Sequence, residues 1–425
     1  MLYQIYDWQR SWLSPVATLA GVGAQWFSNP MSPLAYNPTS SYIAAGLELA
    51  HRLGKEYEKP AWNIHATEVD GRSVRVRIET VLTKPFCQLI HFARELPAQR
   101  PSDPRILIVA PMSGHHATLL RDTVRTLLPA HDVYITDWID ARMVPVSKGP
   151  FSLDDYVAYV REFLQALGPD IHVMAVCQPT VPVLGAVSLM AADHDPALPR
   201  SMIMMGGPID PRCSPTQVNS LASTKPYEWF EHHLIHRVPA RYPGAGRRVY
   251  PGFLQYAGFV SMNPGRHLQS HYDYFLKLVR GDGDDAEAHR RFYDEYNAVL
   301  DMAAEFYLDT IRIVFQEYRL PLSTWDVAGR RVDPACIETV ALFTIEGELD
   351  DISGLGQTEA AQRLCPNIPE HAKRHFIAEG CGHYGIFSGR RWRQNVAPRI
   401  HQFVREFNQS INRKSRNGSK REGAS

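Results

Sequence analysis

The sequence predicts an α/β domain with a mostly parallel sheet that is interrupted by a large insertion. Short apolar runs alternate with amphipathic stretches after residue 104, which is typical of β-α-β units. A segment of alternating polar and apolar residues precedes them and indicates antiparallel strands. The β-α alternation stops near Gly206 and resumes at Thr339, so one domain is interrupted.

The individual elements follow from these patterns in chain order. Residues 1–60 are predicted to form an aromatic-rich helical segment, with a helical run over 41–55, and 62–94 an antiparallel lead-in to the sheet. The predicted core then comprises 61–207 and 335–408. Its expected parallel strands are 105–110, 132–137, 171–176, 201–205, 339–345 and 374–377. Its expected helices are 115–128, 153–167, 179–192, one after Gly356, and 390–407.

The insertion, 208–334, is predicted to begin with loops crowded with aromatic residues and to continue into a long helical stretch over 285–318. Open α/β folds bind ligands at the carboxyl ends of their strands, and an insertion that leaves the sheet there covers this edge. We therefore interpret the insertion as a lid, or cap. The final segment, 409–425, is basic and rich in Ser, Gly and Asn, which predicts a disordered tail.

The composition is that of an ordinary globular protein. Of 425 residues, 44% are hydrophobic and 21% charged, which excludes disorder for most of the chain. Basic and acidic residues both number 45, so no electrostatic feature favours nucleic acid as a partner. The six cysteines lie far apart without a CxxC pair, which argues against a disulfide scaffold and favours a reducing compartment. We expect no secretion signal and no transmembrane helix.

Cys177 lies at a predicted corner between the strand 171–176 and the following helix. Such a turn lifts a nucleophile above the sheet edge and aims it at the N-terminus of that helix. Cysteine suits this position, because a helix N-terminus and a nearby protonated histidine both favour the thiolate. The chain contains no G-x-S-x-G motif. The alternative is that Cys177 is an inert, buried cysteine.

Two loops downstream contain candidates for the acid and the base. The strand VALFTI is followed by Asp350 and Asp351, and the strand RHFIAEG by His383 between Gly382 and Gly385. The order nucleophile, acid, histidine is that of doubly wound hydrolases. We expect Asp350 to orient the imidazole, with Asp351 as the fallback, and His383 to be the general base and acid.

An oxyanion needs two convergent backbone N–H donors. Gln178, directly after the nucleophile, is predicted to supply one. The second is expected from the loop after strand 105–110, where Met112 and Ser113 both remain candidates. Ser113 would otherwise be an ordinary helix-start residue.

Two further motifs are interpreted as structural. His232 and His236 have the spacing of two zinc ligands on one helix face, but the HExxH glutamate and a third ligand are missing. The run 281–285 resembles part of a calcium loop, yet the remaining positions do not follow, so a helix start is preferred. We expect no metal.

Several segments closely resemble the intracellular polyhydroxyalkanoate (polyhydroxybutyrate) depolymerases of bacteria. They are VAPMSGHHATLLRDTVRTLLP, VYITDWIDARMVPVSKGPFSLDDYV, VMAVCQPTVPVL, DMAAEFYLDTIRIVFQEYRLPL, TIEGELDDISGLGQT and GCGHYGIFSG. The similarity spans nearly the whole chain, including the opening MLYQIYDWQR and the insertion. It implies an α/β-hydrolase fold and action on the amorphous storage polyester of intracellular granules. Carried over by motif, it implies Cys177 as nucleophile, Asp350 as acid and His383 as base.

The chain departs from two related patterns. Pro179 replaces the second glycine of the general hydrolase elbow, which suits a helix start. Polyhydroxyalkanoate synthases also use a Cys-His-Asp triad, but typically carry G-x-C-x-G and Asp-His-Ile where this chain has AVCQP and Asp350-Asp351-Ile352. These differences favour the degrading enzyme.

The implied reaction forms an acyl-thioester on Cys177, which either water or another thiol releases. Hydrolysis gives 3-hydroxybutyrate oligomers or monomer, and coenzyme A would give 3-hydroxybutyryl-CoA. The sequence leaves this choice open, and no cofactor is expected other than coenzyme A as an acyl acceptor. The candidates for an apolar polymer groove, each with packing inside the lid as its alternative, are Tyr227, Trp229, Phe253, Tyr256 and Phe259.

The expected partner is the polymer granule surface, contacted through the N-terminal aromatic residues or the basic tail. The expected location is the cytoplasm, and the oligomeric state, including a homodimer, is left open. Two alternative functions remain: a synthase-like acyltransferase and a granule-binding protein without catalysis.

Overall fold

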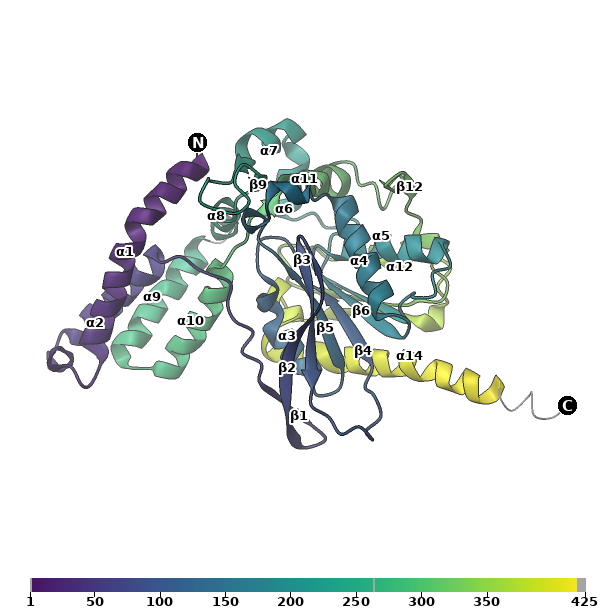
Figure 1. The fold of residues 1–425 in the computed structure, drawn as a ribbon, viewed down its shortest axis with the longest axis horizontal. Coiled ribbons are helices and arrows are strands. Elements are labelled where there is room, and N and C mark those ends of the chain that lie inside the picture. Colours follow the sequence, from purple (N-terminus) through teal and green to yellow (C-terminus); the bar gives the residue numbers. More distant parts are fainter. Residues whose placement is uncertain (1, 263, 419–425) are drawn as a thin grey trace.

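A nine-stranded sheet runs through the centre of the computed structural model, which describes residues 2–262 and 264–418 (Figure 1). Its strand order is β1-β2-β3-β5-β4-β6-β7-β13-β14. Neighbouring strands from β1 to β5 pair antiparallel, and all later neighbours pair parallel. The predicted mostly parallel sheet with an antiparallel lead-in is confirmed. The bounds are β1 Ala66–Val69, β2 Arg72–Lys84, β3 Cys87–Arg94, β4 Arg105–Val109, β5 Asp132–Trp138, β6 Ile171–Val176, β7 Ser201–Met205, β13 Ala341–Gly347 and β14 Lys373–Ala378.

Helices connect the parallel strands where the amphipathic stretches predicted them. They are α3 Arg121–Leu127, α4 Leu153–Leu167, α5 Thr180–Ala192, α12 Ala360–Leu364, α13 Gly389–Arg391 and α14 Ala397–Gly418. Ser152 caps α4 by accepting the Asp155 N–H at 3.2 Å, while the Asp155 carboxylate accepts the Ser152 N–H at 2.8 Å. In α5 every residue from Thr180 to Ala191 is buried, because this helix follows the central strand β6 and is covered on all sides.

The insertion between β7 and β13 is mainly helical. It contains α6 Gln217–Thr224, α7 Tyr227–Leu234, α8 Gly252–Met262, α9 Pro264–Arg280, α10 Gly283–Asn297 and α11 Ala304–Asp309. A small sheet joins them, formed by β8 His236–Arg237, β9 Arg248–Tyr250 and β10 Met302–Ala303. A hairpin of β11 Asp326–Val327 and β12 Arg330–Arg331 follows.

Two predictions for the insertion were wrong. The aromatic residues expected in loops lie largely on α7 and α8, and the expected long helix over 285–318 is broken after Asn297. The break forms because Asp301 is buried and used elsewhere: its carboxylate accepts the Gly252 N–H at 2.8 Å and the Tyr3 hydroxyl at 2.6 Å. These tertiary hydrogen bonds of Asp301 override the local helix propensity, and the sequence pattern does not reveal them.

The helical N-terminal segment predicted for 1–60 is present as α1 Leu2–Ser28 and α2 Ser40–Gly54. Helix α1 packs on α2, and α2 packs on α9 of the insertion. Figure 1 shows this group of helices beside the sheet, with α1 at its outer edge.

At the other end, α14 continues through Gly418, so the expected disordered tail is helical over 409–418. Residues 419–425 lie outside the described residues. Among the described helices, none combines the length and the hydrophobicity that crossing a membrane requires.

Candidate active site

Cys177 occupies a strained turn between β6 and α5. Its φ of 68° lies in the left-handed region, which non-glycine residues rarely adopt and which occurs at functional sites. The backbone holds this conformation, because the Cys177 N–H donates to the Met205 carbonyl at 2.7 Å and its own carbonyl accepts the Thr180 N–H at 3.1 Å. This is the geometry of a nucleophile elbow, with cysteine as the lifted residue.

Two glycines directly after β7 make room for this turn. A Cβ on Gly207 would overlap the Cys177 carbonyl oxygen and Thr180 Oγ1. Gly206 has a φ of 53°, and a Cβ there would lie 2.6 Å from Ile386 Cδ1. Neither glycine was predicted to belong to the site, although two consecutive glycines at the end of a core strand were a visible signal.

His383 and Asp350 form a buried pair at the carboxyl edge of the sheet. His383 Nδ1 lies 2.7 Å from Asp350 Oδ2, and the two side chains are 4% and 0% exposed. The other carboxylate oxygen, Oδ1, accepts the N–H groups of Ile352 and Ser353, both at 2.9 Å. Asp351 is exposed, so the structure brings Asp350 and not Asp351 to the imidazole.

Burial lowers the pKa of His383, but the charges of Asp350 and Cys177 and its hydrogen bonds to both side chains raise it more. The net result is a pKa well above the ordinary range for histidine. Since Nδ1 faces Asp350, Nε2 is the nitrogen left to contact the Cys177 thiol. His383 is therefore hydrogen-bonded to Asp350 on one side of its ring, and the other side is available to the nearby Cys177 thiol.

The raised pKa of His383 makes the stability of the fold depend on pH in a defined direction. A group whose pKa rises on folding stabilises the folded state fully below its unfolded pKa, about 6.5 for histidine, and loses this effect as the pH rises through the folded pKa. We therefore expect Asp350→Asn to destabilise the protein more at about pH 6 than at about pH 9. Urea unfolding of both proteins at the two pH values measures this, and a difference that grows with pH would contradict the assignment.

Of the predicted oxyanion donors, Gln178 directly follows the nucleophile in the chain. Gln178 and Ser113 line the same cavity as Cys177, while the Met112 side chain is fully buried in the core. Within the described part of the chain, the N–H groups of Gln178, Met112 and Ser113 donate to no backbone carbonyl. These donors are therefore available to a ligand, and the geometry does not separate Met112 from Ser113.

A cavity of about 470 Å³ contains Cys177 and His383 in its wall. Most of the lining is apolar and comes from the insertion, which closes over the carboxyl ends of the strands. Phe259 is the one predicted groove residue that lines it. Its other aromatic lining residues were not predicted to belong to the site; they are Phe230, Tyr250, Phe306, Tyr307, Phe315, Tyr384 and Phe387.

The other four predicted groove residues pack elsewhere. Tyr227 and Trp229 pack on the small core of α6 and α7, with Trp229 edge-on to Phe230. Phe253 stacks on Tyr6 of α1 at a ring distance of 4.0 Å, and Tyr256 lines a second cavity beside α1. Predicting them as part of the groove was wrong for this cavity, because aromatic content alone does not indicate which partner a side chain packs against.

Two buried carbonyl oxygens in the main cavity lack a partner among the described residues. Gln255 is 3% exposed and uses its amide N–H groups on the carbonyls of Tyr250 (2.9 Å) and Leu300 (3.0 Å), which leaves Oε1 without a donor. Gln178 Oε1 is also buried without a donor. Both oxygens have almost no accessible surface, so neither is open to a ligand in this conformation.

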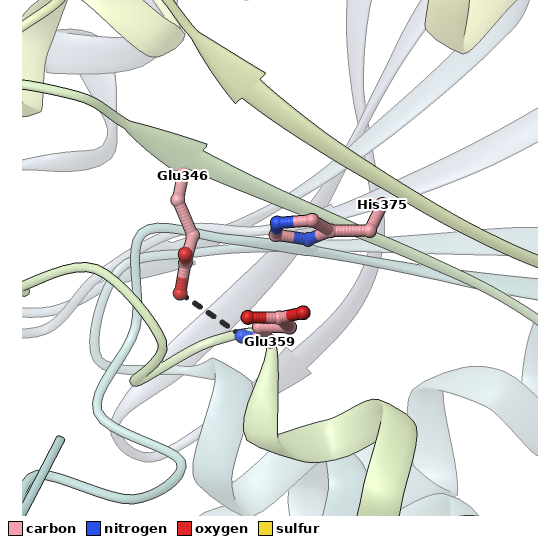
Figure 2. A group of neighbouring side chains, drawn as sticks. All are labelled: Glu346, Glu359 and His375. Carbon is pink, nitrogen blue, oxygen red and sulfur yellow. Dashed lines mark hydrogen bonds between the residues drawn. The ribbon is translucent and has the colours of Figure 1, made fainter.

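Of the metal motifs, the spacing of His232 and His236 does not place them on one helix, because α7 ends at Leu234 and His236 lies in β8. Another cluster has metal-ligand chemistry: Glu346, Glu359 and His375 (Figure 2). However, the Glu346 carboxylate accepts three backbone N–H groups, from Gly356, Thr358 and Glu359, at 2.7–2.9 Å. His375 Nδ1 contacts Thr344 Oγ1 at 2.9 Å, so this cluster is explained by its hydrogen bonds and holds the loop that follows β13.

The family model described as "PHB de-polymerase C-terminus" matches residues 206–408, a range that includes the insertion, Asp350 and His383. No curated protein matches the chain. Among solved structures, a putative lipase from Acinetobacter baumannii AYE is 12% identical over 79% of this chain and 92% of the lipase, with a TM-score of 0.46. A monoacylglycerol lipase from Paleococcus ferrophilus is 12% identical over 72% of this chain and 96% of its own, with a TM-score of 0.42. Both scores lie below 0.5, so the fold assignment depends on the strand order and on the turn at Cys177.

Proposed function

We propose that the chain is a PHB (polyhydroxybutyrate) depolymerase of the α/β-hydrolase superfamily, a carboxylic ester hydrolase that cleaves the polyester through an acyl-cysteine intermediate on Cys177. The observation that carries this proposal is the buried Asp350–His383 pair, with His383 and the partly exposed Cys177 both in the wall of one apolar cavity. It supplies a nucleophile, a base and an orienting acid in one place.

In the first step, Cys177 Sγ attacks an ester carbonyl carbon. His383 holds the thiol proton on Nε2, and Asp350 stabilises the imidazolium that results, since the two groups are 2.7 Å apart. Negative charge develops on the carbonyl oxygen, and the N–H groups of Gln178 and of Met112 or Ser113 stabilise it. The backbone conformation at Cys177 supports this step, because it directs the residue toward both sets of groups.

In the second step, the tetrahedral intermediate collapses and the ester C–O bond breaks. His383 returns its proton to the departing alkoxide, which leaves as the hydroxyl end of a polymer fragment, and the acyl group stays on Cys177 as a thioester. Water, deprotonated by His383, then releases a 3-hydroxy acid. Coenzyme A can replace water as the acceptor, and attack of its thiol on the acyl-cysteine would give 3-hydroxybutyryl-CoA.

The cavity supports an uncharged hydroxyacyl substrate. Its apolar wall suits an aliphatic polyester, and Phe259, Phe306 and Phe315 provide contact area. We propose that the insertion acts as a lid, because it provides most of this wall, and that the enzyme works on cytoplasmic granules.

The experiment that tests this function measures the products released from amorphous poly(3-hydroxybutyrate), with and without coenzyme A, by mass spectrometry. We expect free 3-hydroxybutyrate or its oligomers without coenzyme A, and coenzyme A esters in addition if thiolysis occurs. Incubation with 3-hydroxybutyryl-CoA alone is the control for the synthase-like alternative. Polymer growth with coenzyme A release there, and no acid from the polymer, would overturn the depolymerase assignment.

A further inference from the structure

Helix α1 is amphipathic, but its large apolar side chains face solvent and its charged side chains face the protein. Its charged residues, Asp7 and Arg10, face the protein: Asp7 Oδ1 pairs with Arg241 Nη2 at 2.6 Å, and Arg10 Nη1 donates to the Gly54 carbonyl at 2.9 Å. Its buried residues, Tyr3, Ala17 and Ala24, lie on that same side. The inner face therefore already has its partners.

The outer face of α1 is a continuous apolar stripe. Large side chains recur there every three or four residues, which places them along one side of the helix. We call this set the α1 apolar face: Ile5 (46% exposed), Trp8 (64%), Trp12 (66%), Val16 (63%), Leu19 (71%), Val22 (47%) and Trp26 (60%). Contiguous exposed apolar surface of this kind marks an interaction site, whereas isolated exposed apolar residues do not.

The chemistry of the face restricts the partner. It carries no charged residue, and Arg10, the single basic residue of α1, is used on the inner side. An amphipathic helix that binds anionic lipid headgroups carries Lys or Arg along its polar face, which α1 lacks. The partner is thus uncharged and apolar.

The tryptophans add a second restriction. Each indole N–H is a hydrogen-bond donor without acceptor capacity, and Trp8, Trp12 and Trp26 place three such groups on an exposed surface. An aliphatic polyester has the complementary property, since its repeating units carry ester carbonyl acceptors and no donors. The exposed polar residues Gln4, Gln9 and Ser11 flank the stripe, so an interface with a second copy of the chain is the alternative that the test below has to exclude.

We propose that the α1 apolar face adsorbs the enzyme to the surface of its amorphous polyester substrate. This rests on the proposed function, which supplies the polymer as the partner. The face belongs to the same structural unit as the catalytic cavity, because Tyr6 of α1 stacks on Phe253 of α8, and α8 also carries Phe259 in the cavity wall. Figure 1 shows α1 at the edge of the molecule, where an extended surface can reach it.

The test replaces three tryptophans in one variant, Trp8→Gln/Trp12→Gln/Trp26→Gln. The matched control replaces exposed residues outside α1, Leu53→Gln/Leu268→Gln/Leu322→Gln. Binding is measured by cosedimentation with lipid-free amorphous poly(3-hydroxybutyrate) particles, in a Cys177→Ala background so that cleavage plays no part. Activity is measured separately, with Cys177 present, on a soluble 3-hydroxybutyrate trimer.

We expect the tryptophan variant to bind the particles about tenfold or more weakly, with the control unchanged and the rate on the soluble trimer within about twofold of wild type. Unchanged particle binding would overturn the proposal. The proposal would also be overturned if analytical ultracentrifugation showed a dimeric wild type that becomes monomeric in the variant while particle binding stays the same. Tighter binding of wild type to anionic vesicles than to polymer would overturn it as well. If the wild-type enzyme did not hydrolyse the trimer, this would count against the proposed function. The particle-binding comparison would still test the α1 apolar face.

Discussion

Replacing the nucleophile, Cys177→Ala, is expected to lower the rate of polymer cleavage by about 10⁴-fold or more. The thiol is the one group proposed to form a covalent bond with the substrate, so its loss leaves only the oxyanion donors and the binding cavity. The change removes one atom from a partly exposed side chain, and we expect the folded structure and particle binding to be retained. The rate of 3-hydroxybutyrate release from amorphous polymer measures the effect.

Cys336→Ala is the matched control for this prediction. Cys336 is also a free, partly exposed cysteine, but it lies in the segment before β13 and does not line the cavity. We expect it to retain wild-type activity. If Cys177→Ala kept more than a small fraction of the wild-type rate, the thiol would be structural and the proposed mechanism wrong.

Asp350→Asn is expected to lower kcat by about 10³- to 10⁴-fold. An asparagine oxygen can still accept the N–H groups of Ile352 and Ser353, which keeps the loop in place. It cannot stabilise the imidazolium, and its amide group no longer selects the tautomer that leaves Nε2 facing Cys177. Steady-state kinetics on a soluble 3-hydroxybutyrate trimer separate the effect on kcat from substrate binding.

Asp351→Asn is the control, because Asp351 is adjacent in sequence, has the same side chain and is exposed. We expect its kcat to stay within about twofold of wild type. The opposite result, with Asp351→Asn inactive and Asp350→Asn active, would move the acid to the neighbouring residue and contradict the pairing that the structure contains.

The core of the fold could be predicted because its strands are short, apolar and separated by capped amphipathic helices. The strand 171–176 is buried along its whole length, and the residue that follows it is therefore predicted to lie at the carboxyl edge of the sheet, where a nucleophile is expected. The positions of Asp350 and His383 followed in the same way, since parallel strands end at one edge of a sheet. Asp350 was preferred over Asp351 from the sequence, and in the structure its Oδ2 lies 2.7 Å from His383 Nδ1 while Asp351 is exposed.

The insertion could not be predicted to the same depth. Its aromatic residues occur at spacings that suit a helix, but spacing does not indicate which helix faces the cavity. Phe253 and Phe259 both lie on α8, yet one contacts α1 and the other lines the cavity. The break near Asp301 depends on Tyr3, which lies 298 residues away in the sequence.

The most direct test of the central claim is to trap the acyl-enzyme. The slowed Asp350→Asn enzyme is mixed with the 3-hydroxybutyrate trimer, quenched in acid and analysed by intact-protein and peptide mass spectrometry. We expect a hydroxybutyryl adduct on the peptide that contains Cys177, removed by hydroxylamine and missing from an Asp350→Asn/Cys177→Ala double variant. An adduct on another residue, or product formation in which no enzyme ever carries an acyl group, would contradict the acyl-cysteine mechanism.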